Sequence, residues 1–493
     1  MYKTLVKFKY WVVLFLLFLI LRIPSLFEPY WYGDEGIYLV LGQAIRKGIT
    51  LYTHIHDNKP PTLYYLASLG QTVFGFRLLL LFFMAPTIYF FHRLSHFFLS
   101  PKGSKIATLI FLILTSIPLI EGNIANAEVF MLLPTILGIY IFYNFFHSHP
   151  HTSNLPFKIL IPVGLLLGFA FTIKIPVAVE FAFLCLWIFI DNLNSFQKTF
   201  FKIKNILIFS VAFLLPITFW AVYYYLQGAF IPFLNASLFQ NFGYLSSWST
   251  GTQTSSVSSG GVVTRFLILL VSWALIFLLK NREIISKKFS FLLFWFSATI
   301  FGSLLSGRPY PHYLIQVLPP LTLIIVECLD FKERKKQILS ACSLFLFILI
   351  VFKFKFYFYP VFSYYSNFYS YSIGQKSTVN YRNYFGSQTN DIYQISDFIK
   401  NNTSSIDKIF VWGDQAYIYA LSNRLPSSKY VASYHVADFN GYQSTMNKIK
   451  ANLPKFIVYY KMPDRPFPDL DNFINNYYFA VKVFGDATIF KLR

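Results

Sequence analysis

Charged side chains are scarce in this chain of 493 residues. Asp, Glu, Lys and Arg together make up 13% of it, whereas hydrophobic residues make up 55% and aromatic residues 21%. Ordinary soluble domains carry about 25% charged residues, so this composition excludes a soluble globular enzyme. It also excludes an intrinsically disordered chain, which requires low hydrophobicity. The sequence therefore predicts a polytopic membrane protein.

Cysteines and acidic residues are also few. The three cysteines, Cys185, Cys328 and Cys342, all lie inside apolar runs, so we expect neither a disulfide framework nor a zinc cluster. The 21 acidic residues are outnumbered by 42 Lys and Arg, which gives a formal net charge of +21. A strongly basic chain suggests a nucleic-acid partner, but these cations flank apolar runs, where they orient a chain in a membrane. We therefore expect no nucleic acid.

Apolar runs recur along most of the chain. About 20 apolar residues cross a hydrocarbon core about 30 Å thick, and runs near this length predict about eleven transmembrane helices. They cover residues 10–23, 77–98, 106–120, 129–146, 157–173, 176–190, 203–226, 262–279, 289–305, 313–329 and 338–351. The first run lacks a small-residue cleavage site after it, so it is interpreted as a retained anchor.

The distribution of cations predicts the orientation of these helices. Lys3, Lys7 and Lys9 precede the first run, which places the N-terminus in the cytoplasm by the positive-inside rule. Lysine and arginine then recur in alternate loops, near residues 93–105, 198–204, 280–288 and 332–336. An odd number of crossings puts the C-terminus on the extracytoplasmic side. We expect a multi-pass protein of the plasma (inner) membrane.

The chain divides into three predicted parts. Residues 1–353 form the transmembrane domain, in which residues 24–76 are a first external loop with interfacial helices. Residues 354–388 form an aromatic interfacial connector. Residues 389–493 have the composition of a small soluble α/β fold, which we expect outside the cytoplasm. Its predicted helices cover residues 392–401, 415–421 and 470–476, and its strands cover residues 408–412, 455–460 and a hairpin at 480–492.

The first external loop holds the most suggestive polar residues. Two of the few acids, Asp34 and Glu35, follow the first run closely, and Lys59 precedes two prolines. A carboxylate held at a membrane surface can accept a proton from an acceptor hydroxyl, and a lysine can stabilise a departing phosphate. A plainer interpretation is that Asp34 caps a surface helix. Residue types and spacing leave both interpretations open.

The run from Asp34 to Tyr65 resembles the first external loop of C-type (GT-C) glycosyltransferases. The nearest branch is glycosyltransferase family 39, with the protein O-mannosyltransferases and the bacterial aminoarabinose lipid A transferases. In that group an Asp-Glu pair follows the first transmembrane helix, and a Lys-Pro-Pro motif follows some 25 residues later. Asp34-Glu35 and Lys59-Pro60-Pro61 match both. The sequence departs at Ile37, where the aminoarabinose transferases carry arginine, so their sugar specificity does not transfer.

Three later segments also resemble this family. Glu128 stands where the family carries a second acid at the head of the fourth span. Residues 164–174 resemble its glycine-rich fifth span, which ends in an external lysine, here Lys174. The segment from Ser306 to Tyr313 resembles the external turn before the tenth span and supplies Arg308 and His312.

The resemblance implies a GT-C fold and an enzyme that moves a sugar, a hexose or pentose, from a polyprenyl-phosphate donor to a lipid, glycan or protein acceptor on the extracytoplasmic side, usually with inversion. It implies Asp34 as the catalytic base. The other residues that it implies are catalytic Glu35 and Glu128, and substrate-binding Tyr38, Lys59, Lys174, Arg308, His312 and Tyr313. No cofactor is required by this scheme. A divalent metal remains open, since Asp34 and Glu128 together could bind one.

Structural interpretations stand beside these roles. Arg308 could be an interfacial anchor, His312 an interfacial histidine, Lys174 the end of a span, and Glu128 a helix cap. The alternative functions are a transporter or flippase, which should carry charges at mid-span, and a polysaccharide ligase for lipid-linked sugars. Glu180 within a predicted span is the main support for the first. The Gly/Ser-rich stretch at residues 227–261 is the support for the second.

Overall fold

The computed structural model describes residues 2–149, 155–190, 196–241, 260–329 and 333–493. By contacts the chain divides into two compact units. The first contains Met1–Ile23, Leu80–Trp220 and Gln240–Val361, and the second contains Pro24–Leu79, Ala221–Phe239 and Phe362–Arg493. The predicted C-terminal domain therefore shares a unit with the predicted first external loop. Most of the stretch at residues 227–261 lies outside the described residues.

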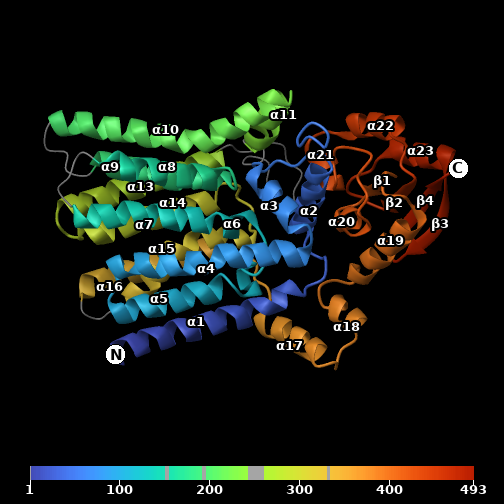
Figure 1. Cartoon of the computed structure of the whole chain (residues 1–493). Helices are drawn as coiled ribbons and strands as arrows, with labels where there is room; N and C mark the ends of the chain where they lie inside the picture. Colours follow the sequence, from blue (N-terminus) through green and yellow to red (C-terminus); the bar gives the residue numbers. More distant parts are fainter. Residues whose placement is uncertain (1, 150–154, 191–195, 242–259, 330–332) are drawn as a thin grey trace. The chain divides into compact units, whose positions relative to one another are not determined.

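The first unit is built from long helices that run side by side (Figure 1). Its elements, some of which extend into the second unit, are α1 (Tyr2–Leu26), α4 (Val73–Phe98), α5 (Pro101–Leu114), η1 (Pro118–Ile120), α6 (Ala127–Phe130), α7 (Leu132–Ser148), α8 (Phe157–Phe171), η2 (Ile175–Val177), α9 (Ala178–Ile190), α10 (Phe196–Leu226), α13 (Gly260–Asn281), α14 (Lys287–Ser303), η4 (Pro311–Val317), α15 (Leu318–Cys328) and α16 (Arg334–Lys353). A helix occurs at each of the predicted spans.

Seven described helical segments are long and apolar enough to cross a membrane, and three shorter apolar helices accompany them. The apolar side chains on their outer faces, such as Val271 and Leu207, are exposed. A lipid environment explains this exposure, because large apolar surfaces are rarely left facing water. The protein is therefore membrane-embedded, as the composition predicts. The count of about eleven spans stays a prediction.

Two glycines on α8 set how closely it approaches α10. A Cβ on Gly164 would lie 2.6 Å from the Cβ of Ala212, and a Cβ on Gly168 would lie 2.2 Å from the carbonyl oxygen of Phe213. No side chain fits at either position. The four-residue spacing puts both glycines on one face of the helix, which is the small-residue packing typical of membrane helices. The glycine-rich span noted in the sequence is thus a packing feature.

The second unit combines the first loop with the C-terminal fold (Figure 1). Its loop helices are α2 (Gly33–Arg46) and α3 (Thr62–Gly70), followed by α11 (Phe230–Leu234) and the π-helical turn η3 (Asn235–Phe239). Its C-terminal helices are α17 (Val361–Ser372), α18 (Thr378–Asn383), α19 (Thr389–Asn402), α20 (Tyr417–Ser422), α21 (Ser433–Asp438), α22 (Tyr442–Ala451) and α23 (Pro468–Tyr477). Helices α2 and α3 both lie within residues 24–76, the first external loop for which helices are predicted.

A four-stranded mixed sheet lies at the centre of the C-terminal fold. Its strands are β1 (Ile409–Trp412), β2 (Phe456–Tyr460), β3 (Tyr478–Phe484) and β4 (Ala487–Leu492), in the order β1-β2-β4-β3. β1 and β2 pair in parallel, whereas β4 is antiparallel to both of its neighbours. The predicted strands and final hairpin are confirmed. α21 and α22 were not predicted, since their short helices carry weak periodicity.

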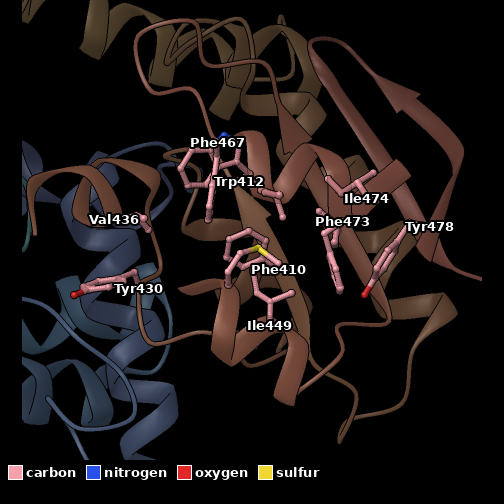
Figure 2. Close-up of a cluster of buried hydrophobic side chains, with 12 residues drawn as sticks. Phe410, Trp412, Tyr430, Val436, Ile449, Phe467, Phe473, Ile474 and Tyr478 are labelled. Atoms are coloured by element: carbon pink, nitrogen blue, oxygen red, sulfur yellow. The ribbon is translucent and has the colours of Figure 1, made fainter. Parts of the chain in front are cut away.

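Side chains from the strands and the surrounding helices form one apolar core. Phe410 and Trp412 of β1 meet Phe467, Phe473 and other buried residues there (Figure 2). Val436 brings α21 into this core, and Tyr430 borders it (Figure 2). The core explains why a stretch of about 100 residues can hold a stable α/β fold.

The loop helix α2 packs directly on this fold through Gly36. A Cβ there would lie 2.8 Å from Cε1 of Tyr417 on α20, whose ring is buried. At Gly33, three residues earlier, a Cβ would meet nothing within 4 Å. The first external loop and the C-terminal fold are therefore fitted to each other within the second unit.

We expect Gly36→Ala to destabilise the second unit by about 1–3 kcal/mol, since the added methyl group forces the buried ring of Tyr417 to move. Gly33→Ala is the matched control and should be neutral or slightly stabilising, because alanine favours the helix over glycine. Thermal unfolding of both variants in detergent measures the difference. Equal melting temperatures for the two variants would show that α20 moves without a loss of stability.

Candidate active site

Asp34 lies in the first turn of α2 and is not its N-cap, so the capping interpretation is wrong. The N-cap of α2 is Tyr32, which makes no side-chain capping bond, and Asp34 is the second residue of the helix. Its Oδ2 accepts a hydrogen bond from the hydroxyl of Tyr38, one turn later, at 3.0 Å. The side chain is 31% exposed. Asp34 is therefore held in place while remaining accessible.

Lys59 joins Asp34 to a second carboxylate. Its Nζ lies 3.5 Å from Oδ2 of Asp34 and 3.6 Å from Oδ2 of Asp57. It also lies over the ring of Tyr38, 5.0 Å from the ring centre. The backbone carbonyl of Lys59 accepts a hydrogen bond from Tyr52 at 2.8 Å. One cation is thus shared between an accessible carboxylate and a buried one.

Asp57 is the buried member of this group. Its Oδ2 accepts a hydrogen bond from the Tyr64 hydroxyl at 2.8 Å, and its Oδ1 accepts one from the backbone N–H of Asn58. Burial alone would raise the pKa of Asp57, but the charge of Lys59, that of His435 when it is protonated, and these hydrogen bonds outweigh burial. The net pKa lies well below its usual range, so Asp57 stays ionised. We call Asp34, Tyr38, Asp57, Lys59 and Tyr64 the loop cluster.

The sequence contained a signal for the two members that were not assigned a role. Asp57 stands two residues before Lys59 within the matched motif, and Tyr64 follows the two prolines. The turn that begins at these prolines brings Tyr64 close to Lys59. The Tyr64 hydroxyl therefore also accepts a hydrogen bond from the backbone N–H of Lys59 at 3.1 Å. Asp57 and Tyr64, on either side of Lys59 in the motif, therefore help to orient it. The proline that follows Lys59 restrains the backbone as well.

Glu35 points away from Asp34 and is fully buried. Both of its carboxylate oxygens accept hydrogen bonds from Arg77, from Nε at 2.9 Å and from Nη2 at 2.7 Å. Nη1 of the same arginine contacts Glu28 at 2.8 Å and donates to the carbonyl of Ser25. This bidentate geometry is that of a structural ion pair. Neighbouring residues on a helix diverge by about 100°, because a turn holds 3.6 residues.

Four of the predicted residues of the first unit form a second group together with Glu121, and we call Glu121, Glu128, Lys174, His312 and Tyr313 the span cluster. Nζ of Lys174 lies 2.7 Å from Oε1 of Glu128 and over the ring of Tyr313 at 5.1 Å. Nε2 of His312 lies 3.8 Å from the same carboxylate oxygen, and its Nδ1 lies 2.5 Å from Oε2 of Glu121. Residues predicted from three separate segments are therefore brought together with Glu121.

Glu121 was missed in the sequence. It directly precedes the polar stretch at residues 122–128, in a chain with few acids, which is the signal that could have found it. Its backbone adopts the left-handed conformation, with φ of 63°, at the end of η1. Its Oε2 also accepts a hydrogen bond from Asn126 at 3.3 Å.

Arg308 and Glu180 belong to neither cluster. Arg308 is half-buried and follows Gly307, whose φ of 67° turns the chain before η4. Glu180 is buried and accepts hydrogen bonds from Gln316 at 2.9 Å and from Trp295 at 3.4 Å. Glu180 thus has polar partners within the bundle, so its presence there does not require a transport pathway.

Asp34 and Glu128, which the sequence suggested as joint metal ligands, belong to different units. Among the described residues, no group of three or more His, Cys, Asp or Glu side chains is arranged to hold a metal ion. The carboxylates of both clusters instead contact lysine, histidine and tyrosine side chains.

Comparison with protein-family models finds no match, and comparison with curated proteins finds none either. Solved structures do match. ArnT from Cupriavidus metallidurans bound to undecaprenyl phosphate matches with a TM-score of 0.56 and 12% identity, over 97% of each chain. Its apo form matches with a TM-score of 0.55.

The oligosaccharyltransferase AglB from Archaeoglobus fulgidus, with dolichol phosphate and an inhibitory peptide, matches at a TM-score of 0.47 and 12% identity. That match covers 98% of this chain and 74% of the other. The similarity to ArnT extends over nearly the whole of both chains, so the C-terminal fold is included. At this level of identity the comparison shows the fold, and the chain has the GT-C glycosyltransferase fold.

Proposed function

We propose that the protein is a membrane glycosyltransferase that moves a sugar from a polyprenyl phosphate to an acceptor on the extracytoplasmic side of the plasma (inner) membrane. The observation that carries the proposal is the loop cluster, in which the accessible carboxylate of Asp34 lies 3.5 Å from the ammonium group of Lys59. It pairs a proton acceptor with a cation at one place. The match of the fold to ArnT bound to undecaprenyl phosphate supports a lipid-phosphate donor.

The reaction follows from these two groups. Asp34 takes the proton of the acceptor hydroxyl as its oxygen attacks the anomeric carbon, which is general base catalysis. The bond between the anomeric carbon and the phosphate oxygen breaks, and its electron pair leaves with the phosphate. Attack opposite to the leaving group inverts the anomeric carbon. The departing phosphate gains one negative charge, which Lys59 stabilises.

The remaining residues receive supporting roles in this proposal. Tyr38 and Asp57 fix Lys59, while Glu35 holds α2 through Arg77. For the first unit the proposal keeps Arg308, Lys174 and His312 as substrate-binding residues, with Tyr313 beside Lys174. Glu128 positions Lys174 through their ion pair. An arginine suits a phosphate because its planar fork can bind two oxygens at once.

A panel of donors tests the proposed function. Purified protein in liposomes is given radiolabelled undecaprenyl-phosphate hexoses and pentoses, and the label released or transferred is counted. We expect one class of donor to be consumed. Its sugar should be transferred when an acceptor is present and hydrolysed slowly when none is present. Failure to consume any of these donors, together with failure to bind undecaprenyl phosphate, would contradict the proposal.

The role of Lys59 has its own expected result. Lys59→Met should weaken the binding of ³²P-labelled undecaprenyl phosphate about 10- to 100-fold, since a hydrogen bond to a charged group contributes about 1.5–3 kcal/mol. Lys59→Arg keeps the charge and should retain most of the affinity. Lys461→Met is the matched control, because Lys461 is exposed beyond β2 in the same unit. Equal affinity for wild type and Lys59→Met would remove Lys59 from the phosphate site.

A further inference from the structure

A histidine from the C-terminal fold contacts the loop cluster. Nε2 of His435, on α21, lies 3.5 Å from Oδ1 of Asp57. The side chain is 6% exposed, and among the described residues its Nδ1 has no hydrogen-bond partner. The remaining contacts of the ring are aromatic, with Tyr434 at 4.4 Å and Phe439 at 5.7 Å. Asp57 is therefore the carboxylate that this buried histidine faces.

The start of α21 is fixed by a polar group at the carboxyl end of β1. Oδ1 of Asp414 accepts hydrogen bonds from the hydroxyl of Ser433 at 2.6 Å and from the backbone N–H of Tyr434 at 3.3 Å. Arg465 donates to both oxygens of Asp414, at 2.7 and 2.9 Å. Val436 meanwhile packs into the apolar core. The sheet thus presents His435 from a firmly held helix.

Only one tautomer suits this position. Asp57 is ionised and accepts hydrogen bonds only, so we infer that the neutral imidazole carries its proton on Nε2, which lies 3.5 Å from Oδ1. Burial lowers the pKa of His435 more than Asp57 raises it, and Lys59 lowers it further. Asp34 and Asp438, the other carboxylates that act on this histidine, oppose this lowering. At neutral pH the histidine is an uncharged donor.

Asp57 therefore lies between two groups that compete for its charge. Its Oδ2 faces Nζ of Lys59 at 3.6 Å, and its Oδ1 faces His435. A hydrogen-bond donor at Oδ1 reduces the negative charge that Oδ2 presents to Lys59. Asp57 therefore holds Lys59 less tightly. A phosphate that binds Lys59 must compete with that same carboxylate.

We propose that His435 is a positioning residue of the phosphate site: by donating to Asp57 it limits how strongly Asp57 holds Lys59, and so sets the affinity for the lipid phosphate. This inference rests on the proposed function, in which Lys59 binds that phosphate. It gives the C-terminal fold a direct part in donor binding. It also makes binding respond to pH, since protonated His435 adds a positive charge beside Asp57.

Binding of ³²P-labelled undecaprenyl phosphate to the full chain in nanodiscs tests the inference. His435→Gln places an amide N–H near the position of Nε2, whereas the shorter His435→Asn does not reach it. At pH 7.5 we expect His435→Gln to bind within about twofold of wild type and His435→Asn to bind about five- to tenfold more weakly. His54→Asn, at an exposed histidine of the same loop, is the matched control and should bind like wild type.

The pH dependence separates this role from a merely structural one. As the pH falls from 7.5 to about 4.5, through the lowered pKa of His435, wild type should gain about threefold or more in affinity relative to His435→Gln, because glutamine cannot be protonated. Taking the ratio of the two proteins cancels the titration of the phosphate itself. A ratio that stays constant with pH would overturn the proposal, and so would equal weakening by Gln and Asn.

The Lys59 variants show which hypothesis has failed. If Lys59→Met loses binding while His435→Asn binds like wild type, the proposed phosphate site stands and the role of His435 is wrong. If Lys59→Met binds like wild type, the proposed phosphate site itself is wrong. Melting temperatures of all variants are measured alongside, and His435→Gln provides a folded comparison if His435→Asn is unstable.

Discussion

Replacing Asp34 with asparagine is expected to lower the turnover of sugar transfer about a thousandfold. A positioned general base contributes about 10²- to 10⁴-fold to a rate, and an amide cannot accept the acceptor's proton. Asparagine keeps an oxygen that can accept the hydrogen bond from the Tyr38 hydroxyl, so α2 should remain folded. Turnover is measured with whichever donor of the panel the wild type consumes.

Donor binding should respond in the opposite direction. Asp34 draws on the charge of Lys59 at 3.5 Å, so its neutralisation leaves more of that charge for the phosphate. The affinity of Asp34→Asn for undecaprenyl phosphate should be unchanged or higher than that of wild type. Loss of turnover with retained binding is the pattern expected of a group that acts in the transition state.

Asp469→Asn is the matched control for this experiment. Asp469 is exposed and also lies in the first turn of a helix, α23, within the same unit. Its replacement should leave turnover unchanged, which separates a chemical role from a general effect of an acid at a helix start. Turnover that survives in Asp34→Asn would remove the proposed mechanism.

Local patterns in the sequence predicted most of the secondary structure. The apolar runs correspond to helices, and the strands β1, β2 and the final hairpin fall where alternation and β-branched residues indicated. These features depend on neighbours a few residues away. The pairing of Asp34 with Lys59 was also within reach, because both lie in one short loop whose motif constrains them.

Contacts between distant segments could not be predicted in this way. His435 meets Asp57 only because α21 is attached to the end of β1 through Asp414, and no local spacing records that attachment. The cluster of Glu121 with His312 depends likewise on helix packing across nearly 200 residues of sequence. Charge and residue type identified candidates, while the fold decided which of them meet.

Arg77→Met should have the largest effect on stability of any change considered, because Arg77 serves two buried carboxylates. Its guanidinium contacts Glu28 at 2.8 Å and Glu35 at 2.7 Å, and all three side chains are at most 1% exposed. Breaking a buried pair by removing one partner costs about 3–5 kcal/mol. We expect a marked fall in melting temperature and in the yield of monodisperse protein.

Two further variants isolate the cause. Arg93→Met lies on the same helix, α4, where Arg93 is exposed, and it should change stability by less than about 0.5 kcal/mol. Adding Glu28→Gln and Glu35→Gln to Arg77→Met removes the unpaired charges and should restore much of the lost stability. No recovery in this triple variant would mean that the loss came from packing of the arginine rather than from charge.

Glu35→Gln decides between the catalytic role suggested by the family resemblance and the structural role suggested by its ion pair. A structural role predicts a lower melting temperature with turnover reduced less than about tenfold, because the glutamine cannot match the bidentate pairing with Arg77. A catalytic role predicts loss of turnover comparable to that of Asp34→Asn at an unchanged melting temperature. The complete burial of Glu35 favours the first result, since a fully buried carboxylate cannot reach a substrate bound, as proposed, at the accessible carboxylate of Asp34.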